Sequence, residues 1–379
     1  MTRPDHPLKD AAPLRVSSFI QQARAEQPAE QAVFIRALDT LLEVRCSTSV
    51  LARALQDYFG PFLAPAGIPD GTLSLHQALP PHFDDPFQDW QPDSKGKPVK
   101  DSFLDCPDGR ITRKIKTGLC FAFSDTDNCL VGPCLEHLNQ VINVINVCFM
   151  RPLMAKGALI GHAAGVAMNG SGLVIAGRSG SGKSTLALHL LSRGASLVSN
   201  DRLLFPLANP GPTMCGVPKH PRVNPGTLLD NPDLQNLLQG PERPELGRLS
   251  FEQLWGLEKK HDVLIHEVFG ANRIRLQAPV RTVLIMGWDH RNQALMRIDE
   301  ADPQADPSLL DPLVKAPGVF LEWAAGGSNP ASVEEYCSRL KSCRFYRISG
   351  GVNFESARRA CQELLDATGS CGLFARPFV

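Results

Sequence analysis

The residues best suited to chemistry form one glycine-rich stretch, Gly177-Arg178-Ser179-Gly180-Ser181-Gly182-Lys183-Ser184. This stretch matches the pattern G-x-x-x-x-G-K-[ST] at every fixed position. Its glycines permit positive φ and leave room for a ligand, so several backbone N–H groups can point at one phosphate. In this pattern the lysine reaches the β- and γ-phosphates and the last hydroxyl binds Mg²⁺. The stretch, together with Thr185, predicts an ATP and Mg²⁺ site.

The flanking residues predict the elements that such a loop needs. An apolar run at 173–176 is typical of a buried parallel strand, and a helical stretch over 184–192 ends before Gly194. A helix that begins at the loop adds free N–H groups and its positive dipole end. The alternative is a chance glycine-rich turn, but the strand before the loop and the helix after it favour the phosphate site.

Three further residues are candidates for the chemistry around the loop. Asp201 ends the next apolar run, 195–198, where a metal-linked carboxylate is expected, although it could also cap a helix or pair with Arg202. Asp289 ends the run 283–288 and is a rival for the metal. His162, on a strand predicted over 158–167, is interpreted either as facing the acceptor or the terminal phosphate, or as a hydrogen-bonded core histidine.

A basic turn later in the chain supplies candidate cations. Lys219 and Arg222 could place positive charge on the γ-phosphate or on an anionic substrate. Asn224, before Pro225-Gly226, indicates a fixed turn near the site. The alternative is a solvated basic loop.

Composition narrows the function classes. The chain has 379 residues, 21% of them charged, with a formal net charge of +0, so it shows no bias toward a nucleic-acid or membrane-surface partner. No apolar run reaches the roughly 18 residues of a membrane helix, and the N-terminus has no apolar signal region. These features predict a cytoplasmic protein. The eleven cysteines contain no C-x-x-C pair and are interpreted as reduced thiols rather than a zinc site.

Periodicity and turn residues predict three parts of an α/β chain. Residues 1–100 form an N-terminal α+β region, with helices near 17–25 and 50–59, a strand or hairpin over 32–45 and a proline-rich linker. Residues 101–157 read as a β-meander followed by a helix. Residues 158–379 form the phosphate-loop domain, with a strand at 280–288 and a terminal helix at 354–367.

The segment 161–202 resembles the HPr kinase/phosphorylase family and its kinase-like relatives, whose phosphate-loop fold is similar to that of phosphoenolpyruvate carboxykinase. His162 lies fifteen residues ahead of Gly177, and Asn200-Asp201 fall where the family carries an acidic pair followed by arginine. The chain is most similar to the HPr kinase-related kinases of the "kinase B" subgroup. The resemblance implies a kinase and a homo-oligomer. Together with the loop motif and the basic turn, it makes His162, Lys183, Asp201 and Arg222 the candidate catalytic residues and places Ser184 and Asp201 at the metal.

The sequence departs from this family at the first member of the acidic pair. That member acts as the proton acceptor in the family, whereas Asn200 cannot accept a proton as a carboxylate does. The residue after the loop serine is Thr185 where the bifunctional enzymes have an acid. A phosphorylase activity is therefore not expected.

Two main functions follow from these observations. The first is an ATP-dependent kinase that phosphorylates a hydroxyl of a protein serine or a small molecule, an acceptor that the sequence leaves unidentified. The second is an ATP-binding regulator or scaffold with weak or no transfer, in which Asn200 reflects the loss of the base. A hydrolytic ATPase is a third class, without a supporting motif.

Overall fold

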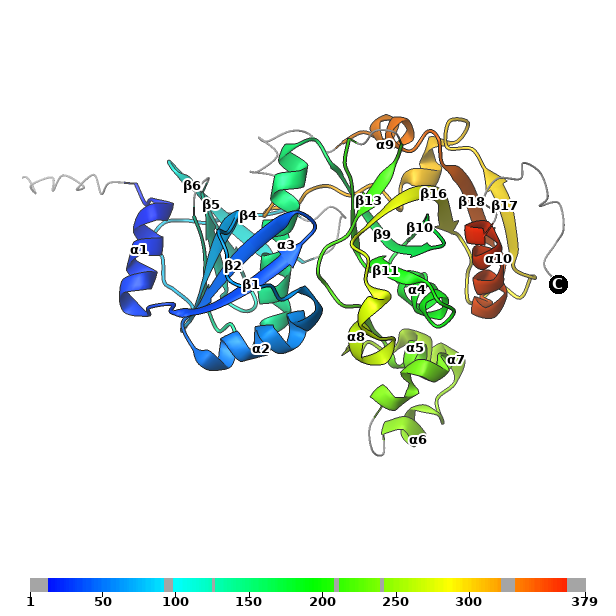
Figure 1. Cartoon of the computed structure of the whole chain (residues 1–379), viewed down its shortest axis with the longest axis horizontal. Helices are drawn as coiled ribbons and strands as arrows, with labels where there is room; N and C mark the ends of the chain where they lie inside the picture. Colours follow the sequence, from blue (N-terminus) through cyan, green and yellow to red (C-terminus); the bar gives the residue numbers. More distant parts are fainter. Residues whose placement is uncertain are drawn as a thin grey trace, which may run out of the picture. The chain divides into compact units, whose positions relative to one another are not determined.

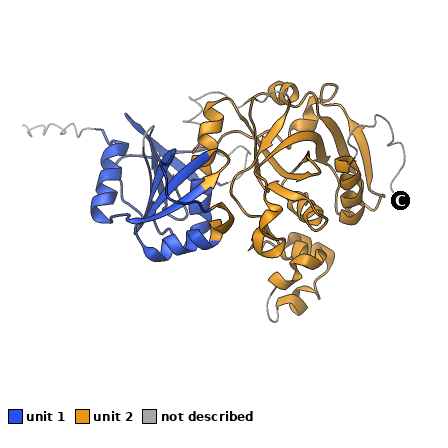
Figure 2. Ribbon diagram, in the orientation of Figure 1, with its two compact units in different colours: residues 1–35, 40–57, 63–145 blue, residues 36–39, 58–62, 146–379 orange. Residues whose placement is uncertain are grey.

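The computed structural model describes residues 13–91, 98–124, 127–207, 211–238, 242–321 and 331–366 (Figure 1). The chain forms two compact units, shown in Figure 2: residues 1–35, 40–57 and 63–145 make the first, and residues 36–39, 58–62 and 146–379 make the second. Each unit combines helices with a large sheet. The expected mixed α/β class is therefore confirmed.

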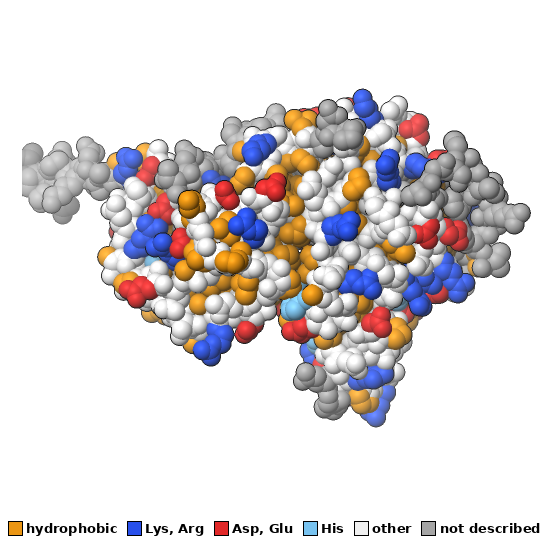
Figure 3. Space-filling model, viewed as in Figure 1, with side chains coloured by type: hydrophobic (Ala, Val, Ile, Leu, Met, Phe, Trp, Pro, Cys, Tyr) orange, Lys and Arg blue, Asp and Glu red, His pale blue; other side chains and the backbone are white. Residues whose placement is uncertain are grey.

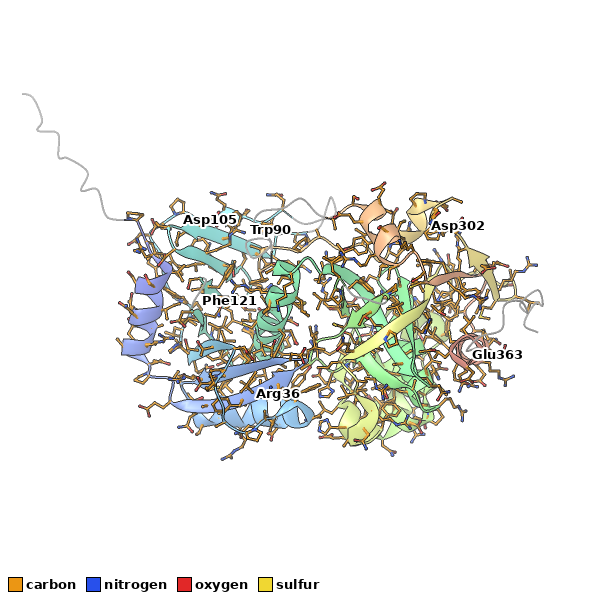
Figure 4. The ribbon with its side chains drawn as sticks, turned by 45° about the horizontal axis from the view of Figure 1, so that its top comes forward. Arg36, Trp90, Asp105, Phe121, Asp302 and Glu363 are labelled. Atoms are coloured by element: carbon orange, nitrogen blue, oxygen red, sulfur yellow. The ribbon has the colours of Figure 1, made fainter. Side chains whose placement is uncertain are left out.

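An eight-stranded mixed sheet organises the first unit, with the strand order β1-β2-β3-β8-β7-β6-β5-β4. The strands are β1 (Gln31–Ala37), β2 (Thr40–Cys46), β3 (Gly71–Gln77), β4 (Gln88–Asp89), β5 (Asp101–Cys106), β6 (Gly109–Lys114), β7 (Cys120–Phe123) and β8 (Asn128–Gly132). The hairpin expected over 32–45 and the meander expected after residue 101 both belong to this sheet. Phe121, labelled in Figure 4, is buried among these strands.

Helix α1 (Val16–Glu26) covers β6, β7 and β8, because its apolar positions Val16, Ile20 and Ala23 recur at helical spacing and are buried. Asp108, in the turn between β5 and β6, accepts hydrogen bonds from the backbone N–H of Val16 at 2.8 Å and of Ser17 at 3.0 Å. A carboxylate at a helix N-terminus is stabilising. The chain continues through α2 (Ser49–Phe59) and α3 (Leu138–Ala155), both expected from the sequence.

Two ten-residue strands, β9 (Leu159–Met168) and β16 (Gln277–Met286), organise the second unit. Strand β10 (Ser171–Gly177) lies between them, antiparallel to β9 and parallel to β16. Strands β12 (Arg202–Phe205) and β13 (Thr213–Cys215) join the other edges of β9 and β16, so these five strands close into a ring. One apolar cluster takes side chains from all five: Ala163, Val174, Leu203, Met214 and Val283.

Helices α4 (Lys183–Leu191) and α10 (Phe354–Asp366) pack together against β9 and β10 (Figure 1). Their apolar faces share a second cluster with Ile175 of β10, because alternate residues of a strand point to opposite faces of the sheet. Glu363 lies on the exposed side of α10 (Figure 4). The second unit also contains strands β11 (Ser196–Ser199), β17 (Arg297–Ala301) and β18 (Arg344–Ser349) and helix α9 (Val333–Arg339).

Residues 224–238 and 242–260 form a helical excursion from this core. It begins after β14 (Arg222–Val223) and ends before β15 (His261–Asp262), and these two short strands pair with each other. The excursion contains α5 (Pro225–Asp230), η2 (Pro232–Leu237), α6 (Glu242–Leu246) and α7 (Phe251–Gly256), with α8 (Ile265–Val268) after β15. A capping box begins α7: the Ser250 hydroxyl accepts from Gln253 N–H, and the Gln253 side chain accepts from Ser250 N–H.

Surface charge is mixed in both units. Figure 3 shows Lys and Arg side chains interspersed with Asp and Glu over the visible face. Within the part of the chain that the structure describes, no helix is long and apolar enough to cross a membrane.

Candidate phosphate-binding site

A single cavity of about 600 Å³ in the second unit gathers most of the residues singled out from the sequence. It is lined by parts of the 177–184 loop, by the start of α4, by His162 of β9, by the turn that follows β11, and by the helical excursion. The lining residues that the sequence predicted are His162, Ser179, Gly180, Gly182, Lys183, Ser184, Thr185, Asn200, Asp201, Lys219, Arg222 and Asn224. Residues separated by more than sixty positions therefore meet at one place.

The 177–184 loop leaves β10 and turns into α4. Gly180 and Gly182 have φ of +80° and +86°, in the left-handed region that favours glycine. A Cβ on Gly182 would also lie 2.6 Å from the Phe354 ring. Gly182 is the N-cap of α4 and offers no side-chain acceptor, so the first N–H groups of the helix are not capped by it. This is the arrangement that an anion at a helix N-terminus requires.

Lys183 is buried inside the loop. Its Nζ donates to the carbonyl oxygens of Gly177 at 2.7 Å and Arg178 at 3.1 Å. Burial lowers the pKa of this amine to about 8, and the nearby Asp201 opposes that shift. The ammonium group thus faces the centre of the loop, where a phosphate chain would lie. Arg178 itself is exposed and outside the cavity lining, so its contribution to the loop is its backbone.

Neighbouring elements hold the loop in place. The Trp288 indole N–H, just after β16, donates to the Ser181 carbonyl at 2.8 Å. Ser181 N–H donates in turn to the Arg178 carbonyl at 3.1 Å. The hydroxyls of Thr185 and Thr227 lie 2.7 Å apart and tie α4 to α5. The loop conformation is therefore fixed by contacts from two sides.

Asp201 is the centre of a charged cluster at the edge of the cavity. Its Oδ1 lies 3.1 Å from His162 Nδ1, and its Oδ2 lies 3.6 Å from Lys219 Nζ and 3.8 Å from Arg202 Nε. Burial disfavours the charged carboxylate, but the hydrogen bond from His162 and the positive charges of Arg202 and Lys219 hold its pKa well below the usual range. Asp201 is thus ionised at neutral pH.

The strand register explains why His162 and Asp201 meet. Arg202, the first residue of β12, pairs with His162 of β9 in the antiparallel ladder. Asp201 therefore lies beside His162 at the edge where β12 begins. The Nδ1 contact directs the other ring nitrogen away from Asp201.

Asn200 lines the same cavity next to Asp201. Its Oδ1 is buried and has no hydrogen-bond partner among the described residues, and the same holds for Asn224 Oδ1. Buried amide oxygens without partners are uncommon in folded proteins. Both side chains therefore carry a buried oxygen without a partner next to the cavity.

The two candidate cations of the basic turn differ in their partners. Lys219 is directed at Asp201, and burial is the main cause that lowers its pKa. Arg222 lies on β14, and its Nε is 3.0 Å from Asp262 Oδ1 on the paired strand β15. Both side chains line the cavity, so the alternative of a freely solvated basic loop is not what the structure shows.

His220 lines the cavity but was not among the residues predicted from the sequence. It is 1% exposed, and its Nδ1 accepts from Ile265 N–H at 3.3 Å while Nε2 lies 3.2 Å from the Tyr58 carbonyl. These contacts fit the neutral tautomer with the proton on Nε2. Burial, followed by the nearby His266, lowers its pKa to about 4.

The buried His220 predicts a loss of stability in acid. The unfolded state takes up a proton near pH 6.5 and the folded state only near pH 4, so stability falls as the pH drops through this window. The free energy of unfolding should fall by about 2 kcal/mol between pH 7 and pH 5 from this group alone. Urea unfolding of His220→Phe should show a pH dependence smaller by that amount. The exposed His82 gives the matched control, since His82→Phe should retain the full dependence.

Asp289, the rival metal acid, does not line the cavity. Its Oδ1 accepts from the backbone N–H of Arg291 at 2.9 Å, and this bond is the main cause that lowers its pKa. Its own N–H donates to Gly350 O at 3.0 Å. Asp289 is thus a turn residue, and Asp201 is the acid that faces the loop.

Sequence reasoning missed an aromatic wall. Phe251, Leu254 and Trp255 of α7, with Phe354 at the start of α10, line the cavity. The sequence around α7 is polar and helical and gives no sign of a binding site. The α7 residues line the cavity only because of the way the helical excursion folds. No local sequence pattern predicts this tertiary packing.

The donor set fits a magnesium ion. Ser184 and Asp201 both line the cavity and offer a hydroxyl and a carboxylate, the oxygen ligands that Mg²⁺ prefers. Mg²⁺ commonly keeps several waters and takes few protein ligands. Among the described residues there is no cluster of three or more His, Cys, Asp or Glu side chains that could hold a metal without other ligands.

Comparisons with known proteins add little to this geometry. The structure of the Hpr(Ser) kinase/phosphatase from Coxiella burnetii is similar to this chain with a TM-score of 0.27 and 14% sequence identity, over 54% of this chain and 93% of that chain. No family model matches the sequence, and no curated protein matches it significantly. A likeness of this size carries no argument about activity, so the function must be inferred from the cavity.

Proposed function

We propose that this chain is an ATP-dependent phosphotransferase that transfers the γ-phosphate to a hydroxyl group. The observation that carries the proposal is the meeting of the 177–184 loop with the His162–Asp201 pair in one cavity. The loop suits a polyphosphate, and the pair suits the end where a phosphoryl group is transferred. The cavity volume of about 600 Å³ is in the range of small-molecule sites.

Phosphoryl transfer depends mainly on positioning and on neutralising charge. The backbone N–H groups of the loop and the first turn of α4 would hold the phosphates, and the Lys183 ammonium would contact the β- and γ-phosphates. Lys219 and Arg222 would add positive charge around the transferred group. His162, held through Nδ1 by Asp201, would orient the acceptor or the terminal phosphate.

Ser184 and Asp201 would hold the Mg²⁺ ion, Asp201 through water, since its oxygens already lie against His162, Lys219 and Arg202. When bound, the metal neutralises charge on the β- and γ-phosphates. We extend the proposal to a phosphate-loop fold of the HPr kinase type, a cytoplasmic location and a homo-oligomer.

Asn200 favours a second candidate, an ATP-binding regulator with little transfer. It stands beside Asp201 and supplies no carboxylate to accept the acceptor's proton. A base is helpful for phosphoryl transfer but is not obligatory. The kinase remains the primary proposal, because His162, held by Asp201, lines the same cavity as the loop, and binding of a nucleotide alone needs no group to orient an acceptor.

Transfer of label from γ-³²P-ATP distinguishes the kinase from the ATP-binding regulator. Purified protein is incubated with Mg²⁺ and a cell extract separated into protein and small-molecule fractions. The proposal predicts labelled acceptor in one fraction, with no label when the ATP carries ³²P at the α position. Tight ATP binding without transfer to either fraction would favour the regulator.

Replacing Asn200 with Asp should raise the transfer rate at least tenfold, because general-base catalysis contributes roughly 100- to 10,000-fold. Two adjacent carboxylates also raise one another's pKa, which makes one a better base. The rate constant of label transfer at saturating ATP measures the effect. Asn224→Asp places the same charge elsewhere in the cavity and is the control; an equal response of both variants would mean that Asn200 does not occupy the position of the base.

A further inference from the structure

The phosphate loop has chemically different neighbours on its two sides. On one side of β10, strands β9 and β12 carry His162 and the start of the Asp201 turn. On the other side, β16 leads to Trp288, and β18, parallel to β16, leads to Phe354. The charged cluster and the aromatic residues therefore flank the loop from opposite directions.

Aromatic side chains on the second side are fixed in place. The Phe354 ring packs edge-on against Trp288, with centroids 5.0 Å apart and an interplanar angle of 85°. Trp288 is buried and anchored by its hydrogen bond to the Ser181 carbonyl. Phe354 is thus a rigid surface next to Gly182 of the loop.

Trp255 continues this surface from the helical excursion. Its indole stacks on the His290 ring at 4.8 Å with an interplanar angle of 18°, and Phe251 lies 5.4 Å from it. His290 follows β16, so this stack belongs to the same side of the loop as Phe354. Trp255 is half-buried and lines the cavity, which gives a partly exposed aromatic surface on the path of a ligand that extends from the loop.

We propose that Trp255, Phe251 and Phe354 form the nucleobase site of this cavity, an inference that rests on the proposed function. A triphosphate on the loop with its γ end at the His162–Asp201 pair must extend its nucleoside toward the opposite side. Flat π surfaces there match the face of a nucleobase, and base–aromatic stacking contributes usefully to binding in proteins. The helical excursion would therefore serve to close the cavity over the base.

Dissociation constants for Mg-ATP and for inorganic tripolyphosphate distinguish the nucleobase site from the phosphate site, because tripolyphosphate has no nucleobase. Trp255→Leu is the best variant, because the Trp255 ring packs on Phe251 and His290, whereas Phe354 packs on Gly182 of the loop. We expect Trp255→Leu to weaken ATP binding about tenfold or more and to leave tripolyphosphate binding within about twofold of wild type. Trp255→Phe should restore most of the ATP affinity.

Trp90→Leu is the matched control, since Trp90 packs on Phe103 in the first unit and should not affect either ligand. The inference is overturned if Trp255→Leu binds ATP as wild type does; the aromatic residues would then be a site for the phosphoacceptor. It is also overturned if the variant loses affinity for ATP and tripolyphosphate to the same extent. If the wild-type protein binds neither ligand, the proposed function itself fails, and this result is distinct from the two outcomes for Trp255→Leu.

Discussion

Replacing Lys183 with Ala is expected to lower the rate of label transfer roughly 100- to 1,000-fold, the scale for removing one preorganised electrostatic contact from a transition state. The Lys183 ammonium is buried in the centre of the loop and donates to two of its carbonyls. No other side chain of the described loop can place a positive charge there, because Arg178 is exposed and lies outside the cavity lining.

Two controls keep this prediction interpretable. Lys259→Ala removes an exposed lysine paired with Glu242 and should leave transfer within about threefold of wild type. The midpoint of thermal unfolding of Lys183→Ala shows whether the protein is destabilised when the Gly177 and Arg178 carbonyls lose their hydrogen-bond donor. A folded Lys183→Ala protein that keeps more than a tenth of the wild-type rate would contradict the assigned role.

The second large effect is expected at Asp201. Asp201→Asn keeps the shape and an acceptor for His162, but it removes the negative charge that balances Lys219 and Arg202. We expect at least a 100-fold loss of transfer and a higher Mg²⁺ requirement. Because the pKa of Asp201 lies well below its usual range, the carboxylate is ionised throughout pH 5–8 and the loss should be the same across that interval.

Asp289→Asn is the natural comparison, since both acids follow an apolar strand. Its carboxylate accepts a turn N–H and does not reach the cavity, so the change in transfer rate and in Mg²⁺ requirement should stay below about threefold. A larger loss from Asp289→Asn than from Asp201→Asn would reverse the assignment of the metal acid.

Local sequence predicted much of the fold around the loop. The strands at β9, β10 and β16 and the helix α4 are confirmed, because long apolar runs and glycine-bounded helices leave clear patterns. Short strands such as β13, β14 and β17 were not predicted, since two to five residues carry too little periodicity. Their existence depends on partners distant in the chain.

The candidate site could be predicted residue by residue but not as an arrangement. The sequence singled out His162 and Asp201 separately, and only the β9–β12 register shows that their side chains meet. Arg222 was singled out as a candidate cation for the γ-phosphate or an anionic substrate, but the sequence did not predict its partner Asp262, which lies on a strand forty residues later. The aromatic wall was missed because Trp255 reaches the cavity through tertiary packing of the helical excursion.

A structure of the chain with Mg²⁺ and a non-hydrolysable ATP analogue tests the central claim most directly. The account predicts β- and γ-phosphate oxygens within hydrogen-bond distance of Lys183 Nζ and of the loop N–H groups. The metal should lie by Ser184 and Asp201, with the γ end toward His162. A nucleotide bound outside this cavity, or one whose γ-phosphate points away from the His162–Asp201 pair, would contradict it.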